Sequence, residues 1–406
     1  MLMNKTVEGT PLSDIVSSQY EKWVYPKPIL DLRGWLQNNW QWFDPSHAYR
    51  MFWPTGEIRS DLDILVAGCG TNQAAVFAYN NPEAKVVAID VSQPSLDHHQ
   101  YLKDKYVLKN LELRLLPIEE VGSLGRDFDL IVSTGVLHHL ADPKIGMQSL
   151  AQCLRQNGVA ALMLYAKYGR IGVEMLQSVA RDLGLQQDEE SLQIVKSMLA
   201  ALPQNHPIKS YLSIAPDLQF DAGVVDTFLH GRDRSYSIDD CMDLVNSAGL
   251  VFQGTFMKSQ YYPAPDINSP FYNAVSRLPA SAQWAIMERI NFNNGCHFFM
   301  SCRPDRPAQT YQIDFTSQAA LSYMPALRYR CELNGNTLSR YNWRITLDPF
   351  ELIFAQGING KRTIREIIQR ASQHDAVADQ TAQALESFGL ALMQRLWQLD
   401  MLEVSW

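Results

Sequence analysis

Two glycines and an aspartate stand at spacings that could hold a nucleoside. Gly68 and Gly70 follow the short apolar run 64–67, and the helical pattern 74–77 comes directly after them. This order predicts a buried strand, a tight turn and a helix. Asp90 ends a second apolar run, 85–90, roughly 20 residues after the first glycine, the spacing of an acid that accepts hydrogen bonds from ribose hydroxyls. The pattern predicts a nucleoside site at the end of a strand.

A histidine pair follows another apolar run, 128–133. His138 and His139 would lie at the carboxyl edge of a parallel sheet, where ligands of open sheets bind. An imidazole there can act as a base or as a substrate anchor near neutral pH. The alternative is that the pair only stabilises the loop.

Two polar groups further along the chain are candidate substrate contacts. Tyr165, Tyr168 and Arg170 lie in a glycine-rich stretch at the end of the next predicted strand. A second group precedes the helix expected from Ile238, and its members are His230, Arg232, Arg234 and Tyr236. We expect both groups to contact the substrate, and the alternative is an irregular connector whose polar groups satisfy one another.

Alternating strands and helices must position these residues. Strands are expected near 62–67, 85–90, 111–116, 128–133 and 158–166, and then at 250–256 and 296–302. Asp142 with Pro143, and Ser237, are placed to begin helices. Strands that alternate with helices predict a parallel, doubly wound sheet.

The order of these motifs resembles the class I (Rossmann-like) S-adenosylmethionine-dependent methyltransferases over about residues 60–305. The resemblance implies a seven-stranded α/β sheet with its last strand antiparallel, S-adenosylmethionine as cofactor, S-adenosylhomocysteine as product, and no metal. It implies catalytic roles for His138, His139 and Tyr165. The cofactor-binding residues it implies are Ala67, Gly68, Cys69, Gly70, Asn72, Gln73, Asp90, Val91, Ile118, Thr134, Gly135 and Tyr20.

The chain departs from the family pattern at two positions. Val66 stands where the family has an acid, and Asn72 where it has a third glycine. Asparagine tolerates a left-handed backbone, so the loop shape is expected to survive more easily than the charge. Nicotinamide dehydrogenases, the nearest other class, need a glycine at the position of Gln73, so the motif disfavours them.

Three further parts surround the predicted core. Residues 1–60 read as a helical extension rich in aromatic side chains, of which Tyr20 could close over the sulfonium of the cofactor. Residues of about 170–236 interrupt the core and are expected to form a helical lid. Residues 306–406 are expected to form a small, mainly α domain that recognises a partner or is purely structural.

Bulk composition limits the partners. The net charge of −8 means that the protein has no overall positive potential to attract nucleic acid. No apolar run is long enough to cross a membrane. The amino terminus lacks the pattern of a signal peptide, so a cytoplasmic protein is expected.

The additions to the core favour a protein as methyl acceptor, for example a side-chain amide as in the phycobiliprotein asparagine methyltransferases. A small-molecule N- or O-methyltransferase, or a non-catalytic module that binds S-adenosylmethionine, are the alternatives. The sequence leaves the acceptor atom and the oligomeric state open.

Overall fold

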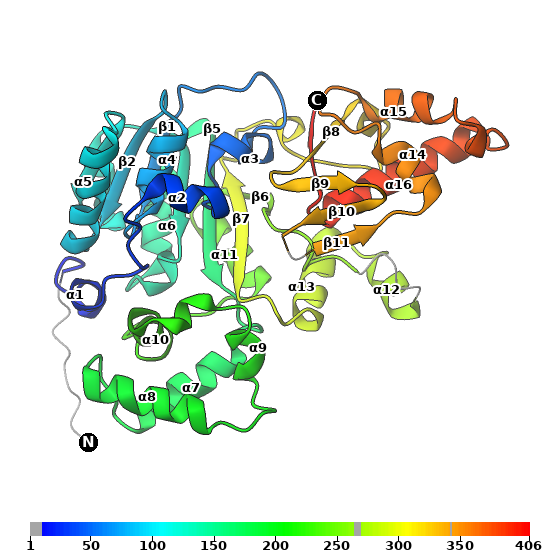
Figure 1. The fold of residues 1–406 in the computed structure, drawn as a ribbon. Helices are drawn as coiled ribbons and strands as arrows, with labels where there is room; N and C mark the ends of the chain where they lie inside the picture. Colours follow the sequence, from blue (N-terminus) through cyan, green and yellow to red (C-terminus); the bar gives the residue numbers. More distant parts are fainter. Residues whose placement is uncertain (1–9, 264–268, 342) are drawn as a thin grey trace. The chain divides into compact units, whose positions relative to one another are not determined.

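The computed structural model describes residues 10–263, 269–341 and 343–406. The chain divides into two compact units (Figure 1), each built from segments that are distant in sequence. The first unit holds residues 1–43, 60–254 and 288–305, and the second holds residues 44–59, 255–287 and 306–406. The three-part division at residues 60 and 306 that the sequence suggested stays a prediction. The compact units also divide at 59/60 and 305/306, but they have further boundaries at 43/44, 254/255 and 287/288.

The first unit is organised around a seven-stranded sheet with the order β3-β2-β1-β4-β5-β7-β6. The pairs β1–β2, β2–β3, β1–β4 and β4–β5 are parallel, whereas β7 runs antiparallel to β5. This arrangement confirms the predicted doubly wound sheet with an antiparallel last strand. The strands are β1 (Asp63–Ala67), β2 (Lys85–Asp90), β3 (Leu111–Leu115), β4 (Phe128–Thr134), β5 (Leu154–Tyr165), β6 (Val251–Thr255) and β7 (Cys296–Cys302).

The central strands form because their apolar runs are buried on both faces. In β4 all but the last residue is buried, and four of the five residues of β1 are. Continuous apolar runs of this length are typical of parallel strands covered by helices on both sides. The covering elements are α4 (Gln73–Asn80), α5 (Gln93–Tyr106), α6 (Pro143–Gln152), α11 (Ile238–Ser247) and the short 3₁₀ turns η1 (Ile118–Leu124) and η2 (Leu137–His139).

Two helix starts follow the chemistry expected from the sequence. The Asp142 carboxylate caps α6 by accepting from the amide of Lys144, with Pro143 at the first helical position. Ser237 and Asp240 form a reciprocal capping box at the start of α11. These caps fix where the chain leaves the histidine loop and where it leaves the segment 230–236.

The insertion after β5 is helical, as expected. It consists of α7 (Ile171–Asp182), α8 (Glu189–Ala201), α9 (Ile208–Leu212), η3 (Pro216–Gln219) and α10 (Asp221–Phe228), drawn in green in Figure 1. These helices share a small apolar core around Val173, Leu192, Ile208 and Val225, and Trp23 from the amino-terminal segment packs against it. That segment contributes α1 (Ile15–Lys22) and α2 (Leu32–Asn38). We call residues 171–228 the lid.

The second unit has its own core and its own sheets. A three-stranded sheet has the order β11-β10-β9, and β12 pairs with β8. Its elements are α3 (Pro45–Phe52), α12 (Pro270–Val275), most of α13 (Ala280–Ile290), β8 (Met324–Leu327), β9 (Cys331–Asn334), β10 (Thr337–Arg340), β11 (Trp343–Thr346), α14 (Pro349–Ala355), α15 (Ile364–Ala371), α16 (Ala382–Gln398) and β12 (Leu402–Ser405), with the short 3₁₀ turns η4 (Ala308–Thr310), η5 (Gln318–Ser322) and η6 (Asp375–Val377).

The carboxyl-terminal part of this unit is less purely helical than its sequence suggested. Helices α14, α15 and α16 suit the mainly α domain that was expected, but strands β8 to β12 lie in the same stretch. Each of these strands has four residues, too few to show a clear alternation in the sequence. Within the described ranges, no helix combines the length and the apolar character that crossing a membrane requires.

Candidate active site

The turn after β1 brings bare backbone to the carboxyl edge of the sheet. Gly68 and Gly70 have φ angles of +74° and +54°, a region that side-chain-bearing residues rarely occupy. A Cβ on Gly68 would lie 2.4 Å from a methyl of Val136, which precedes the histidine loop. Gly135, at the end of β4, also has a positive φ. The two loops therefore approach each other through glycine, as a nucleoside cradle requires.

The segment 25–29 is fastened to this glycine loop. The hydroxyl of Thr71 donates to the carbonyl of Pro26 at 2.8 Å. The side chain of Asn72 makes two more hydrogen bonds to this segment: it donates to the carbonyl of Lys27 and accepts from the amide of Ile29. Asn72 was predicted to bind the cofactor, but both ends of its side-chain amide are hydrogen-bonded to the segment 25–29. We call these two hydrogen bonds the Asn72 clasp.

Asp90 ends β2 beside the glycine loop. Its carboxylate accepts from the amide of Gly70 at 2.8 Å and from the amide of Ser92 at 2.9 Å. Burial raises the pKa of Asp90 to about 6, although these amides lower it. The amide of Val91 and the thiol of Cys69 also act on this carboxylate and lower its pKa. The position fits the expected role.

The remaining predicted cofactor residues surround the same edge. Gln73 donates through its amide nitrogen to the hydroxyl of Thr134 at 3.1 Å, which links the glycine loop to the end of β4. Ala67, Cys69 and Ile118 are buried, and Val91 is half-buried. Tyr20 reaches this edge only through its backbone carbonyl, 3.4 Å from the hydroxyl of Ser92.

A buried carboxylate, Asp226 of α10, accepts hydrogen bonds from side chains of two distant segments. Tyr20 donates to Oδ1 at 2.8 Å and Gln19 donates to the same oxygen at 3.4 Å. Tyr165, at the end of β5, donates to Oδ2 at 3.3 Å. Burial raises the pKa of Asp226, while His139 and the Tyr20 hydroxyl lower it. Asp226 lies in the middle of a lid helix and is not among the site residues predicted from the sequence.

A buried ion pair lies beside this carboxylate. Arg170 donates to Oδ2 of Asp233 at 2.8 Å and to the hydroxyl of Tyr211 at 2.7 Å. Its guanidinium carbon lies 3.7 Å from the centre of the Tyr165 ring, and the His138 ring stacks on Tyr165 at 3.9 Å. Two groups so close to the ring centre must cover opposite faces. Tyr165 is therefore fixed, with its hydroxyl turned to Asp226.

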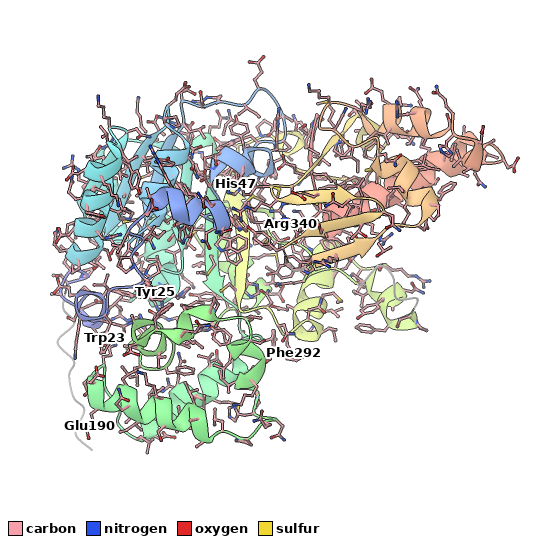
Figure 2. The ribbon with its side chains drawn as sticks, in the orientation of Figure 1. Trp23, Tyr25, His47, Glu190, Phe292 and Arg340 are labelled. Atoms are coloured by element: carbon pink, nitrogen blue, oxygen red, sulfur yellow. The ribbon has the colours of Figure 1, made fainter. Side chains whose placement is uncertain are left out.

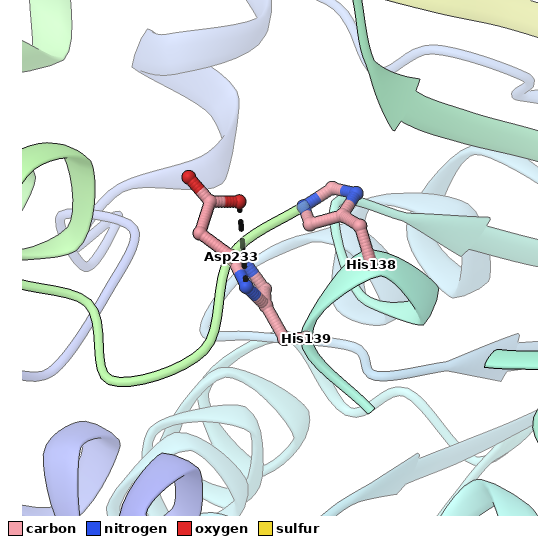
Figure 3. A group of neighbouring side chains, drawn as sticks. All are labelled: His138, His139 and Asp233. Carbon is pink, nitrogen blue, oxygen red and sulfur yellow. Dashed lines mark ion pairs between the residues drawn. The ribbon is translucent and has the colours of Figure 1, made fainter. Parts of the chain in front are cut away.

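The histidine pair differs in its partners (Figure 3). His139 donates from Nδ1 to the carbonyl of Arg232 at 2.8 Å, so its Nε2 carries the lone pair. That Nε2 is buried and has no partner among the described residues. Burial, then the neighbouring His139, hold the pKa of His138 well below its ordinary value. His139 is therefore the better placed of the two to accept a proton.

Not all of the predicted substrate residues face this cluster. His230 stacks on His139 at 3.8 Å, and its Nε2 lies 3.4 Å from the Tyr20 hydroxyl. Arg232 and Arg234 instead donate to backbone carbonyls of the histidine loop, and Arg232 also pairs with Asp14. Tyr236 bridges to Ala166 through its backbone. Tyr168 is half-buried. The two arginines hold the loop against the segment 230–236.

Two groups in this region have ligand atoms within 4.8 Å of one another, a spacing that could suit a metal ion: His138 with His139 and Asp233, and His139 with Asp226 and His230. In the second group the imidazole rings stack at 19° to each other, so their in-plane lone pairs cannot converge on one ion. In the first group, Nδ1 of His139 already donates a hydrogen bond to a backbone carbonyl, and Asp233 already forms an ion pair with Arg170. As arranged, the cluster suits an organic acceptor better than a metal.

Comparison with known proteins agrees with this geometry. A family model described as "Methyltransferase domain" matches residues 65–160, the glycine loop through β5. The residues of that match contain the cradle described above and all or part of strands β1 to β5. A methyltransferase domain therefore lies at residues 65–160, and the sheet of the first unit has the class I methyltransferase fold that the motif order predicted.

Relatives of the methyltransferase domain differ in what they act on. An uncharacterized protein from Synechococcus sp. is 27% identical over 262 residues, 62% of each chain. The tRNA 5-carboxymethoxyuridine methyltransferase of Escherichia coli is 33% identical over 110 residues, 27% of this chain and 42% of that one. The chain thus spans less than two thirds of the length of these curated relatives.

A solved structure shares the fold over most of the chain. PKMT2 from Rickettsia typhi, in complex with AdoHcy, is 13% identical with a TM-score of 0.63, and the likeness covers 89% of this chain and 75% of that chain. At this identity the likeness shows the fold. It extends well beyond the methyltransferase motifs.

Protonation of Asp90 should couple to donor binding. Because a ribose hydroxyl favours the ionised carboxylate, binding should lower the Asp90 pKa from about 6 and release protons between about pH 5 and 7. The affinity for S-adenosylhomocysteine should therefore rise with pH across this window. Calorimetry at pH 6 in buffers of different ionisation enthalpy measures the protons released.

The control for this coupling is Asp90→Asn, which cannot titrate. It should bind the ligand more weakly, with no proton release assigned to this site and a flatter pH dependence. Equal proton release by the variant and the unmodified protein would contradict the role of Asp90.

Proposed function

We propose that the protein transfers the methyl group of S-adenosylmethionine to a nitrogen of a protein side chain. The observation that carries this proposal is the position of the Asp226 cluster at the same sheet edge as the donor loop. Ser92, two residues after Asp90, contacts the carbonyl of Tyr20, and Tyr20 in turn contacts Asp226. A donor held by Asp90 would thus lie next to a buried set of polar groups able to orient an acceptor.

The donor site uses groups that the structure leaves available. Asp90 would take the ribose, and Gly68 and Gly70 would admit the methionine end close to the backbone. Val66 offers no charge to the methionine amine, but the Oε1 atom of Gln73 is an acceptor at this edge because its nitrogen donates to Thr134. S-adenosylmethionine supplies the methyl group on a sulfonium, and the protein aligns the acceptor with it and receives its proton.

The acceptor side is supplied by the lid and the amino-terminal segment. His139 would receive a proton at Nε2, with Nδ1 held by the carbonyl of Arg232. Tyr165 would position the acceptor through its hydroxyl, and His138 supports Tyr165 by stacking on it.

A protein acceptor is favoured over a metabolite or a nucleic acid. The lid, the amino-terminal segment and the second unit together exceed what enclosing a small molecule needs, and the shared fold with PKMT2, a protein methyltransferase, extends over these additions. The tRNA methyltransferase relative matches only 27% of this chain, and a net charge of −8 offers no general attraction for RNA. The cytoplasmic location stays a prediction.

The test uses the full-length chain and radioactive methyl donor on an extract of cells that lack the protein. We expect label in the protein fraction, and none when Asp90→Asn replaces the unmodified protein. Label only in RNA or only in small molecules would replace the protein acceptor by those alternatives. Donor binding by calorimetry with no label in any fraction would favour a non-catalytic binding module.

A further inference from the structure

The charges around Asp226 leave an excess of negative charge in the acceptor site. Asp226 and Asp233 are both buried, and Asp217 is half-buried with its Oδ2 accepting from the hydroxyl of Tyr25 at 2.7 Å. Arg170 pairs with Asp233, and Nδ1 of His139, which would carry charge only if that ring were protonated, lies 3.9 Å from the other oxygen of the same carboxylate. Burial holds the pKa of His230 well below its ordinary value, so that imidazole adds no positive charge.

The hydrogen bonds of Asp226 define what can bind next to it. Its three partners, Gln19, Tyr20 and Tyr165, all donate. The pKa values of both tyrosines lie well above their ordinary value, first because of burial, so their hydroxyls keep the protons they donate. Two contacts occupy Oδ1, and Oδ2 has one contact and a lone pair to spare. A group that completes this shell must donate a hydrogen bond.

From this arrangement we propose that Asp226 binds the acceptor, and that the acceptor is an aliphatic primary amine, the group of a lysine side chain, which enters as an ammonium ion. This inference rests on the proposed function and names its substrate class. An ammonium ion has three donors and a full charge, so it matches both the spare lone pair and the excess negative charge.

A side-chain amide fits the same position less well. Its NH₂ could donate to Oδ2, but its carbonyl would need a donor, and the neighbouring tyrosine hydroxyls already donate to Asp226. It also brings no charge to compensate the acids. The amide that the sequence analysis offered as an example is therefore the weaker candidate.

The transfer balances with the groups present. The ammonium first gives a proton to Nε2 of His139, which leaves a neutral amine with a lone pair. That lone pair forms the new nitrogen–carbon bond as the carbon–sulfur bond breaks, and the sulfur keeps the bonding electrons. The products are the methylated ammonium ion, S-adenosylhomocysteine and a protonated His139, which returns its proton to solvent.

Side chains on the way from the surface region of the amino-terminal segment to the Asp226 cluster are not fully buried. Tyr20, Tyr25 and His230 are each half-buried although their polar tips point inward. Figure 2 labels Tyr25 and Trp23, which lie beside the lid helices. An extended aliphatic chain can lie against these rings, and an ammonium is attracted to their faces.

The first test measures binding of n-butylammonium, a mimic of the lysine tip, by saturation-transfer NMR in the presence of S-adenosylhomocysteine. We expect saturable binding, weakened about thirtyfold by Asp226→Asn because a charged hydrogen bond is lost, and restored in part by Asp226→Glu. The control Asp182→Asn, at the exposed end of lid helix α7, should bind as the unmodified protein does. Equal binding of n-butanol and n-butylammonium, or no binding of n-butylammonium, would overturn the proposal.

The second test identifies the labelled residue in proteins modified by the full-length chain. Recovery of methylated lysine after acid hydrolysis supports the amine. Label released as methylamine shows an amide acceptor and overturns the inference while the proposed function stands. Label released as methanol by alkali shows a carboxyl acceptor and overturns both the inference and the transfer to nitrogen. Absence of protein label overturns the proposed function itself, whatever the n-butylammonium result. If the purified protein contained a stoichiometric metal ion, that ion would neutralise the carboxylates in place of an ammonium group. This result would also overturn the inference.

Discussion

Gly68→Ala will weaken the binding of S-adenosylhomocysteine by about a hundredfold. The new Cβ would lie 2.4 Å and 2.7 Å from the two methyl carbons of Val136, and the residue must keep a φ of +74°. Overpacking of this kind costs ~1–3 kcal/mol, and a left-handed conformation adds ~1–2 kcal/mol. A loop that shifts to relieve the overlap moves away from the donor. Calorimetric titration of the ligand measures the loss.

Two further variants separate the two effects of Gly68→Ala, the steric overlap with Val136 and the strain of a positive φ. Gly125 has a φ of +61° with no atom near its would-be Cβ, so Gly125→Ala carries the strain alone and should bind the ligand normally. Adding Val136→Ala to Gly68→Ala removes both methyl contacts and should recover part of the affinity. If Gly68→Ala binds within twofold of the unmodified protein, the loop between β1 and α4 does not hold the donor.

Arg170→Met will lower the free energy of unfolding by about 3–5 kcal/mol, the cost of leaving a buried carboxylate without its cation. The Arg170 and Asp233 side chains are 1% and 6% exposed, so water cannot replace the guanidinium. The same change removes the group that covers one face of Tyr165. Denaturant titration measures the stability, and methyl transfer should fall with it.

A second substitution, at Asp233, shows whether Arg170 stabilises the protein through its charge or through its packing on Tyr165. Asp233→Asn in the Arg170→Met background removes the stranded charge and should recover about half of the lost stability. Arg181→Ala, at the exposed end of the same helix, should change stability by less than ~0.5 kcal/mol. A double variant no more stable than Arg170→Met would show that packing on Tyr165, not the ion pair, makes Arg170 important.

The sheet could be predicted because its strands are continuous apolar runs that end in recognisable turns. Strands β2 and β7 begin and end at the predicted residues, and the capped starts of α6 and α11 follow the expected chemistry. Each of these features depends on neighbours in sequence. The proposed donor side depends on the same local features, which is why Gly68, Gly70 and Asp90 could be predicted to lie together at the carboxyl edge of the sheet.

The acceptor side could not be predicted in the same way because it depends on contacts between distant segments. Asp226 lies between apolar residues of α10 and is 206 positions from Tyr20, with which it shares a hydrogen bond. Asp233 was not among the residues predicted for the site, whereas the structure pairs it with Arg170. The visible signal was an acid in a buried helix face, and only the packing of the lid gives it a partner.

The Asn72 clasp and the Asp226 cluster have a consequence for how such a protein can change in evolution. Residues 19–29 reach both sites, because Gln19 and Tyr20 contact the lid while Pro26, Lys27 and Ile29 are held by the glycine loop. A substitution that reshapes the acceptor side at Tyr20 therefore acts on a segment that also shapes the donor side. New acceptor specificities should arise through paired changes in the amino-terminal segment and the lid, and homologues with a different lid should carry a different residue at the position of Asn72.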